Sequence, residues 1–252
     1  MIEIFILSII QGITEFLPVS SSSHLILISK YFNFDNQSLA IDVSLHMGSF
    51  IAVLYYFYKD IIRFFNNKVI FIKILISSIP VMIIGFLLVE TGVIEKFRNI
   101  KIIAFTTILF GVLLFISDKF KLEKSIDKNF TFKSALFIGF FQILSLVPGV
   151  SRSGIAITAA RLLNFKRVEA GKISFLISIP ILGAVSIYGM KNIILSDNLS
   201  LSYFNIISIF LSFFFSLITI KYFLKYINNF NLNLFVYYRI ILGLILIKLA
   251  YL

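Results

Sequence analysis

The sequence predicts an all-α membrane protein, a polytopic helix bundle in which two half-chains form an inverted-topology repeat. Hydrophobic residues make up 59% of the chain and charged residues only 14%, whereas a soluble domain has about 25% charged residues. Apolar stretches long enough to cross a bilayer recur along the chain. Two similar polar motifs interrupt further apolar stretches. These observations exclude a soluble globular protein and predict a single integral membrane domain over residues 1–252.

Six stretches match the roughly 17–25 residues that a membrane-spanning helix needs. They lie at about 39–58, 69–90, 100–118, 173–190, 205–224 and 234–252. Residues 2–34 and 134–163 instead consist of two short apolar pieces around a polar centre, "PVSSSSH" in one and "PGVSRSG" in the other. Because proline and glycine break helices, each pair of pieces is expected to form a re-entrant helical hairpin.

The two hairpin centres match one another at an offset of 130 residues. The matched pairs are Pro18 and Pro148, Ser21 and Ser151, and Ser23 and Ser153. Each hairpin is followed by three predicted spans, which gives repeat halves 1–118 and 134–252 joined by the linker 119–133. Because three is odd, the second half is expected to lie inverted. The broken helices of such repeats meet near the membrane midplane and form the binding site.

The distribution of charge predicts the orientation of the chain in the membrane. The net charge is +11. Thirteen basic residues fall on the side reached after the first predicted span, among them five lysines of the linker 119–133, and six fall on the other side. Basic loops favour the cytoplasm, so the linker is expected to be cytoplasmic and both termini extracytoplasmic. The basic balance thus indicates membrane lipids as partners, with no nucleic acid, and the lack of cysteine excludes disulfides and thiolate metal sites.

The motif "QGITEFLPVSSSSHL", residues 11–25, carries the first set of candidate site residues. Gln11 and Glu15 are four residues apart and share one helix face. A carboxylate in a membrane segment indicates a functional site, the alternative being an ion pair with Arg152 or a lysine. For Gln11, an interhelical hydrogen bond is an equal alternative. Ser20, Ser21 and Ser22 form a donor-rich loop suited to phosphate oxygens, supported by the N–H groups that begin the next helix.

The chain has two histidines, and the sequence favours only one as a site residue. His24 follows the serine loop and the helix that carries Glu15, so we expect it to act as an acid, a base or a nucleophile. His46, in "LHMGS", has no polar neighbours of this kind and is expected to be structural.

The motif "PGVSRSG" carries the second set. Arg152 stays charged everywhere and can bind a phosphate with two parallel hydrogen bonds. Ser151 and Ser153 flank it, and Gly149 lets the backbone approach a ligand. Carboxylate, serine, histidine and arginine from two hairpins suit phosphoryl transfer, in which positioning and charge stabilisation dominate.

With these two motifs in the predicted order of segments, the whole chain resembles the undecaprenyl-diphosphatase (bacitracin-resistance) family of bacterial membrane phosphatases. The resemblance implies hydrolysis of undecaprenyl (C55) pyrophosphate to undecaprenyl phosphate and inorganic phosphate, which recycles the lipid carrier of peptidoglycan synthesis and confers bacitracin resistance. It also implies a divalent cation, Mg²⁺ or Ca²⁺, with Glu15 and Gln11 as candidate ligands. This chain has Gln11 where the family's first carboxylate stands, which weakens a two-carboxylate metal site.

The resemblance implies catalytic roles for Glu15, Ser21, His24 and Arg152 and leaves open whether Ser21 or His24 attacks phosphorus. The competing class is a transporter, because inverted repeats with broken helices also move lipid phosphates across membranes. The serine loop with His24 favours the enzyme. We expect a multi-pass protein of the bacterial plasma membrane that binds a polyprenyl pyrophosphate, with a homodimer as an open alternative to a monomer.

Overall fold

The computed structural model describes residues 1–32, 39–66, 68–195 and 203–251, and every regular element in these ranges is a helix. The elements are α1 (Ile2–Thr14), α2 (Ser21–Phe32), α3 (Leu39–Tyr56), α4 (Tyr58–Asn66), α5 (Lys68–Glu90), α6 (Val93–Lys96), α7 (Ile100–Asp118), α8 (Ile126–Asn129), α9 (Phe132–Ile143), the 3₁₀ helix η1 (Leu144–Leu146), α10 (Arg152–Leu162), α11 (Arg167–Leu195), α12 (Tyr203–Asn229) and α13 (Asn233–Tyr251). The prediction of an all-α helix bundle is confirmed.

Five helices in the described ranges are long and apolar enough to cross a membrane: α5, α7, α11, α12 and α13. They match five of the six predicted spans. The sixth, predicted at 39–58, is the 18-residue helix α3, which at about 1.5 Å per residue lies at the short end of the range for a membrane span. The helix ends at Tyr56, and after Phe57 the chain continues in the charged helix α4, with Lys59, Asp60 and Arg63.

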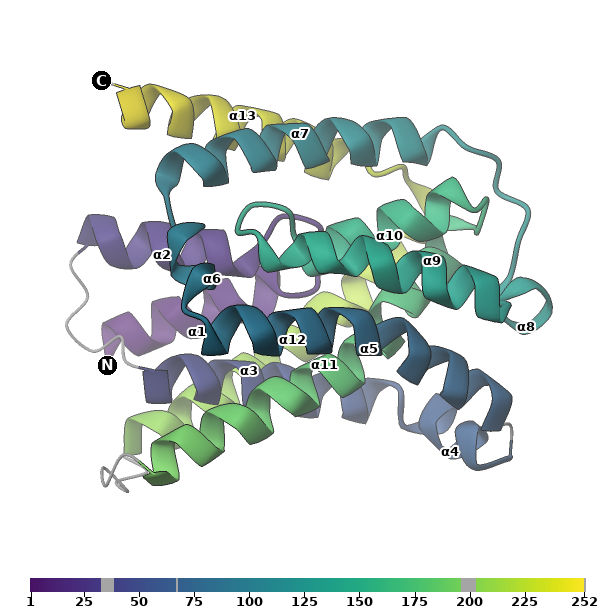
Figure 1. The fold of residues 1–252 in the computed structure, drawn as a ribbon, viewed down its shortest axis with the longest axis horizontal. Helices are drawn as coiled ribbons and strands as arrows, with labels where there is room; N and C mark the ends of the chain where they lie inside the picture. Colours follow the sequence, from purple (N-terminus) through teal and green to yellow (C-terminus); the bar gives the residue numbers. More distant parts are fainter. Residues whose placement is uncertain (33–38, 67, 196–202, 252) are drawn as a thin grey trace.

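Both predicted hairpins are present as pairs of short helices, α1 with α2 and α9 with α10. Figure 1 shows that the two pairs enter the molecule from opposite ends and that their turns meet near its centre. The two chain ends and α6 lie at the end from which α1 and α2 enter, and α4 and α8 lie at the other end.

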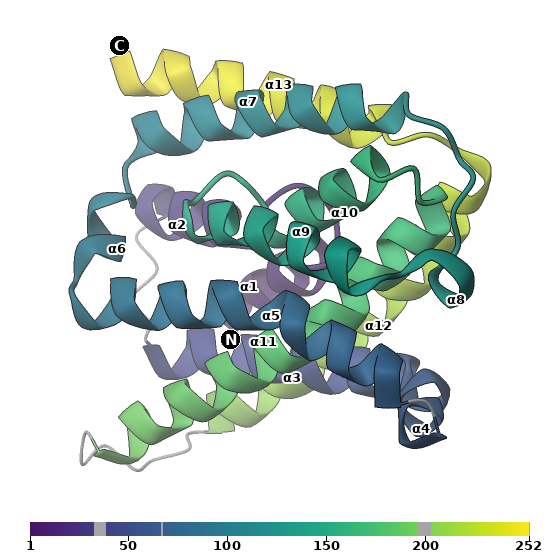
Figure 2. The same cartoon turned by 45° about the vertical axis from the view of Figure 1, so that its right-hand side comes forward.

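The hairpins are held between two layers of long helices (Figures 1 and 2). One layer consists of α7 and α13, which pack along each other, and the other contains α3, α5, α11 and α12. The contacts are reciprocal, because α1 packs on α12 and α9 packs on α5. Such reciprocal pairing is what two inverted halves related by a twofold axis would produce.

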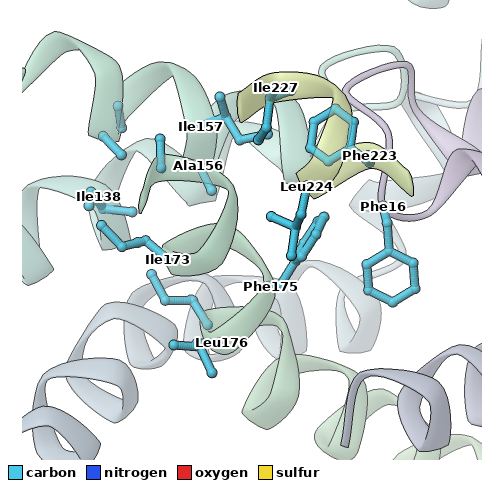
Figure 3. Close-up of a cluster of buried hydrophobic side chains, with 14 of the residues drawn as sticks. Phe16, Ile138, Ala156, Ile157, Ile173, Phe175, Leu176, Phe223, Leu224 and Ile227 are labelled. Carbon is cyan, nitrogen blue, oxygen red and sulfur yellow. The ribbon is translucent and has the colours of Figure 1, made fainter. Parts of the chain in front are cut away.

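Apolar side chains fill the space between the second hairpin and its neighbours (Figure 3). Phe175 of α11 lies at the centre of this cluster, with its ring centroid 5.2 Å from that of Phe16 and 5.8 Å from that of Phe223. Because Phe16 belongs to the turn of the first hairpin, the cluster joins both halves of the chain.

Small residues bring α3 and α12 into close contact. A Cβ atom at Gly48 would lie 2.3 Å from the Ile209 carbonyl oxygen, so only glycine fits there. One residue further on, the Ser49 hydroxyl hydrogen-bonds the hydroxyls of Ser212 at 3.1 Å and Ser216 at 2.9 Å. Small residues and interhelical hydroxyl bonds are the usual means of helix packing in lipid.

Candidate active site

The turn of the first hairpin runs from Glu15 to Ser20. Pro18 disfavours helical backbone in the residue before it, so α1 cannot continue through this turn. Ser20 has a φ of 76°, which reverses the chain before α2 begins at Ser21. The Ser20 hydroxyl lies 3.4 Å from that of Ser22 and 3.0 Å from that of Ser23. The turn therefore gathers the hydroxyl groups of the predicted serine loop.

The turn of the second hairpin requires a glycine. Gly149 has a φ of 94°, and a Cβ atom there would lie 2.0 Å from the Thr106 hydroxyl oxygen. Ser151 has a φ of 72° and caps α10 by accepting a hydrogen bond from the Gly154 N–H at 3.1 Å. The Ser153 hydroxyl lies 3.2 Å from that of Ser151. Serine hydroxyls therefore line this turn as well.

The helix starts correct the predicted register between the two hairpins. α2 begins at Ser21 and α10 begins at Arg152, and the residue before each helix, Ser20 or Ser151, has a positive φ. Ser21 therefore corresponds to Arg152, and Ser20 corresponds to Ser151, at an offset one residue larger than 130. The predicted pairing of Ser21 with Ser151 is wrong. The reason is that one more residue separates Pro148 from the helix start than separates Pro18 from it.

The two turns contact each other directly. The Gly149 N–H donates to the Ser20 hydroxyl at 3.3 Å, and the Ser153 hydroxyl donates to the Leu17 carbonyl at 2.7 Å. Ser20, Ser151 and Ser153, which were predicted to bind substrate, are all buried. The hydroxyls of Ser20 and Ser153 therefore hold the two turns together.

Glu15 is the centre of the polar contacts between the hairpins. One carboxylate oxygen, Oε2, accepts hydrogen bonds from the Ser21 hydroxyl at 2.6 Å and from the Gln11 amide at 3.0 Å. The other, Oε1, forms an ion pair with Arg152. Glu15 is 7% exposed. The buried negative charge is thus compensated by an arginine from the opposite hairpin, as expected for a charge at membrane depth.

A polar cavity of about 170 Å³ opens beside this carboxylate. Its polar wall consists of side chains from both hairpins, with one from α3, namely Thr14, Glu15, Ser20, Ser21, Ser22, Ser145, Ser151, Arg152 and His46. The structure therefore brings together Glu15, Ser21 and Arg152, three of the four predicted catalytic residues. Hydroxyl and guanidinium donors around one cavity suit a phosphate ligand.

The two histidines lie in different surroundings. His24 is not among the residues that line the cavity. Its Nδ1 lies 2.7 Å from the Ser20 carbonyl oxygen and its Nε2 lies 2.5 Å from the Tyr238 hydroxyl, so both ring nitrogens have protein partners. His46, expected to be structural, lines the cavity. Sequence proximity to the serine loop favoured His24, but α2 turns that side chain toward α13.

Arg239 of α13 is a residue of the site that the motifs do not indicate. Its side chain is completely buried. It donates to the carbonyls of Pro18 at 3.1 Å, Gly149 at 2.8 Å and Val150 at 3.0 Å, and so holds both hairpin turns. A further bond at 3.1 Å reaches the Thr107 carbonyl of α7. An arginine inside the predicted span 234–252 was the signal that could have identified it.

Gln11 and Glu15 were the candidate metal ligands. In the described residues, no three His, Cys, Asp or Glu side chains come together around one point. The Gln11 Oε1 atom, however, is buried without a hydrogen-bond partner in the structure, and it belongs to the residue whose amide nitrogen contacts Glu15. One carboxylate and one amide oxygen are too few to hold a hard divalent cation by themselves. They fit such a cation only if a bound phosphate compound supplies most of the remaining oxygens.

An apolar groove of about 700 Å³ leads away from the polar cavity. Four residues line both spaces, namely Val81, Leu146, Ile181 and Val185. The groove runs between α5 and α11 and is lined further by Val43, Phe86, Ala184 and Tyr188. A ligand with a polar head and a long apolar chain fits this combination.

Comparisons with known proteins agree with this architecture and site. A family model described as bacitracin resistance protein BacA matches residues 4–245. A protein of Pelagibacter ubique (strain HTCC1062) named undecaprenyl-diphosphatase is 50% identical over 251 residues, which cover 99% of this chain and 98% of that protein. Proteins of the same name from Hahella chejuensis (strain KCTC 2396) and Roseobacter denitrificans (strain ATCC 33942 / OCh 114) are 38% and 36% identical. They cover 96% and 99% of this chain and 95% and 98% of their own lengths. This multi-pass helix bundle therefore belongs to the family of bacitracin resistance protein BacA.

Proposed function

We propose that this protein is a membrane phosphatase that hydrolyses undecaprenyl pyrophosphate to undecaprenyl phosphate and inorganic phosphate. The observation that carries the proposal is the Glu15 carboxylate, which binds Ser21 of one hairpin and Arg152 of the other beside a polar cavity. The names of the relatives support the same reaction. The product would return the lipid carrier to peptidoglycan synthesis, and this recycling is the basis of bacitracin resistance.

Ser21 is the proposed nucleophile. Its hydroxyl donates to Glu15 at 2.6 Å, so the carboxylate is placed to take the proton as the oxygen attacks the terminal phosphorus. The bond from that phosphorus to the bridging oxygen breaks, and the electron pair leaves with the lipid monophosphate. Water then hydrolyses the phosphoserine and releases inorganic phosphate. His24, with both ring nitrogens bonded, holds the turn at Ser20 rather than attacking phosphorus.

Arg152 stabilises the charge that develops on the phosphate. Its guanidinium has five N–H donors, and the contact with Glu15 leaves donors for a ligand in the cavity. Hydrogen bonds from the hydroxyls of Ser22 and Ser151, which also line the cavity, would fix the remaining phosphate oxygens. Gly149 and Ser153 act on this site indirectly, by holding the two turns against each other.

The apolar groove is the proposed site of the polyprenyl chain next to the pyrophosphate. A large side chain placed in the groove should weaken binding of the polyprenyl chain more than it slows the chemical step. In an Ala184→Trp variant, we expect KM to rise about tenfold for undecaprenyl pyrophosphate and less for a short isoprenyl pyrophosphate. Leu109→Trp, at a side chain of α7 that is 62% exposed, is the matched control.

A divalent cation, Mg²⁺ or Ca²⁺, is proposed to bind together with the substrate. Glu15 and the unpartnered amide oxygen of Gln11 would hold it, with pyrophosphate oxygens completing the coordination. The cation would neutralise charge on the pyrophosphate. We expect calorimetry to show weak Mg²⁺ binding to the free protein and at least tenfold tighter binding in the presence of inorganic pyrophosphate. A Gln11→Glu variant should bind Mg²⁺ more tightly without pyrophosphate.

The charge distribution supports one orientation in the bacterial plasma membrane. The linker 119–133 and α4 lie at the same end of the molecule, and both chain ends lie at the other (Figure 1). We propose that the end with α4 and α8 is cytoplasmic and that both termini are extracytoplasmic.

The experiment that tests the function is phosphate release from undecaprenyl pyrophosphate by the detergent-purified protein. With a ³²P label on the terminal phosphate, rapid acid quenching should trap a labelled phosphoserine at residue 21. Wild type is expected to release phosphate, and Ser21→Ala is expected to lose both the release and the trapped label. A wild-type protein that releases no phosphate in detergent, and that moves lipid phosphates between leaflets after reconstitution into vesicles, would refute the proposal in favour of a transporter.

A further inference from the structure

His46 lines the active-site cavity, and one of its ring nitrogens, Nε2, has no hydrogen bond from the described residues. Its Nδ1 lies 2.8 Å from the carbonyl oxygen of Asp42, one helical turn earlier. A carbonyl oxygen only accepts hydrogen bonds, so Nδ1 must carry a proton. The structure shows no hydrogen bond at Nε2 from the described residues, and the side chain lines the cavity with Glu15, Ser21 and Arg152. Nε2 is therefore the atom that can exchange a proton with a bound ligand.

The position of His46 on α3 places it where the cavity meets the groove. Val43 lies three residues earlier, on the same face of the helix, and lines the apolar groove. His46 lines the polar cavity. A lipid pyrophosphate with its chain in the groove must place the phosphate attached to that chain at this boundary. The terminal phosphate then lies deeper, toward Ser21 and Arg152.

We propose that His46 is a catalytic residue that binds the lipid-linked phosphate and donates its Nε2 proton to the leaving oxygen. The inference rests on the proposed function. As the bond between the terminal phosphorus and the bridging oxygen breaks, the electron pair stays on that oxygen, which takes the proton from the His46 imidazolium. The neutral imidazole then regains a proton from the water that hydrolyses the phosphoserine. Acid catalysis and base catalysis thus alternate on one ring.

The surroundings of His46 fit this role. The charged side chains that share its cavity are Glu15 and Arg152. Glu15 interacts with His46 electrostatically, and the structure records no hydrogen bond or ion pair between these two side chains. Of the other helices packed on α3, α11 contributes Ile181, Leu182 and Val185 to this cavity, and α12 meets α3 through serines. Asp42, on α3 itself, uses its backbone carbonyl for the ring.

The test compares wild type, His46→Gln and His46→Ala in detergent with undecaprenyl pyrophosphate. Tyr55→Phe, at a side chain that is 62% exposed on the same helix, serves as the control for substitutions in α3. Glutamine keeps a hydrogen-bonding group but cannot pass on a proton. We expect both His46 variants to lose about 100-fold in kcat, with no rescue by glutamine. We also expect the pH profile of the rate to differ between wild type and both His46 variants, because only wild type has a ring that can pass on a proton.

Product inhibition tests which of the two phosphates contacts His46. Loss of His46 should weaken inhibition by undecaprenyl phosphate at least tenfold and leave inhibition by inorganic phosphate unchanged, because only the lipid-linked phosphate meets His46. A His46→Gln protein with the rate and pH profile of wild type would overturn the inference. A lower rate with an unchanged pH profile and unchanged product inhibition would also overturn it, because a structural role explains that result. Wild type that releases no phosphate would instead refute the proposed function.

Discussion

Arg239 should be indispensable for the geometry of the site although it does not line the cavity. Its guanidinium donates to four backbone carbonyls, those of Pro18, Gly149, Val150 and Thr107. In Arg239→Lys, the single ammonium group keeps the charge but cannot span acceptors that surround a planar fork. If lysine satisfies two of the four carbonyls, the other two are left buried and unpaired. Each unpaired group costs about 1–3 kcal/mol, so the variant should lose roughly 2–6 kcal/mol of stability.

The same substitution should lower the rate for each folded molecule. Three of the four carbonyls belong to the hairpin turns, so their relaxation would move Ser21 and Arg152 relative to each other. A displacement of about 1 Å can cost about 100-fold in rate. Thermal unfolding in detergent measures the first effect, and phosphate release divided by the folded fraction measures the second.

Arg161 provides a matched control for this prediction. It is also completely buried, at the opposite end of α10. It donates to the carbonyls of Lys121 at 3.0 Å and Asp118 at 3.1 Å and pairs with the Asp118 carboxylate at 3.4 Å, away from the cavity. Arg161→Lys should therefore be destabilised while the rate per folded molecule stays unchanged. If Arg239→Lys melts at the wild-type temperature and keeps the wild-type rate, the reasoning from its four bonds is refuted.

Three further predictions follow from the ion pair and the topology. Glu15→Gln should lose at least about 100-fold in kcat because the Ser21 hydroxyl then lacks a base, and a variant with most of its activity would make Glu15 a structural counter-ion only. Arg152→Lys should insert normally into the membrane and still lose about 100-fold in kcat, because one ammonium cannot contact both Glu15 and a phosphate as the guanidinium does. Near-full activity of this variant would reduce Arg152 to a point charge. Single cysteines at the exposed positions Lys96 and Lys121 should react with an impermeant reagent from opposite sides of the membrane, and labelling from one side would refute the inverted arrangement.

The breaks in the helices could be predicted from the sequence because their causes are local. Pro18, Pro148 and Gly149 end or bend helices through their own backbone chemistry, and the structure has both turns at these residues. The meeting of Glu15 with Arg152 was expected as one alternative, because buried charges in a membrane need partners. Local chemistry therefore predicted both the turns and the polar pair between them.

The positions of the two histidine rings could not be predicted, because they depend on how helices are rotated against each other. His24 is only three residues from Ser21, yet its ring stacks on Tyr238 of α13. His46 reaches the cavity from a different helix. Neither the hydrophobic pattern nor the spacing of motifs contains that rotation. The register of the hairpins failed for a related reason, because one added residue in the second turn cannot be recognised from matched serines and prolines alone.

The corrected register has an evolutionary consequence. Ser21 and Arg152 occupy equivalent positions at the start of α2 and α10, and they bind the two oxygens of the same carboxylate. If the halves arose by duplication of one ancestral unit, they have since specialised, the first providing a carboxylate and the second a guanidinium at the shared centre. Two copies of the first half would leave each Glu15 without the arginine that compensates its buried charge. Separately expressed halves should thus regain activity only as a mixed pair, so that phosphate release could report the association of the two fragments inside a membrane.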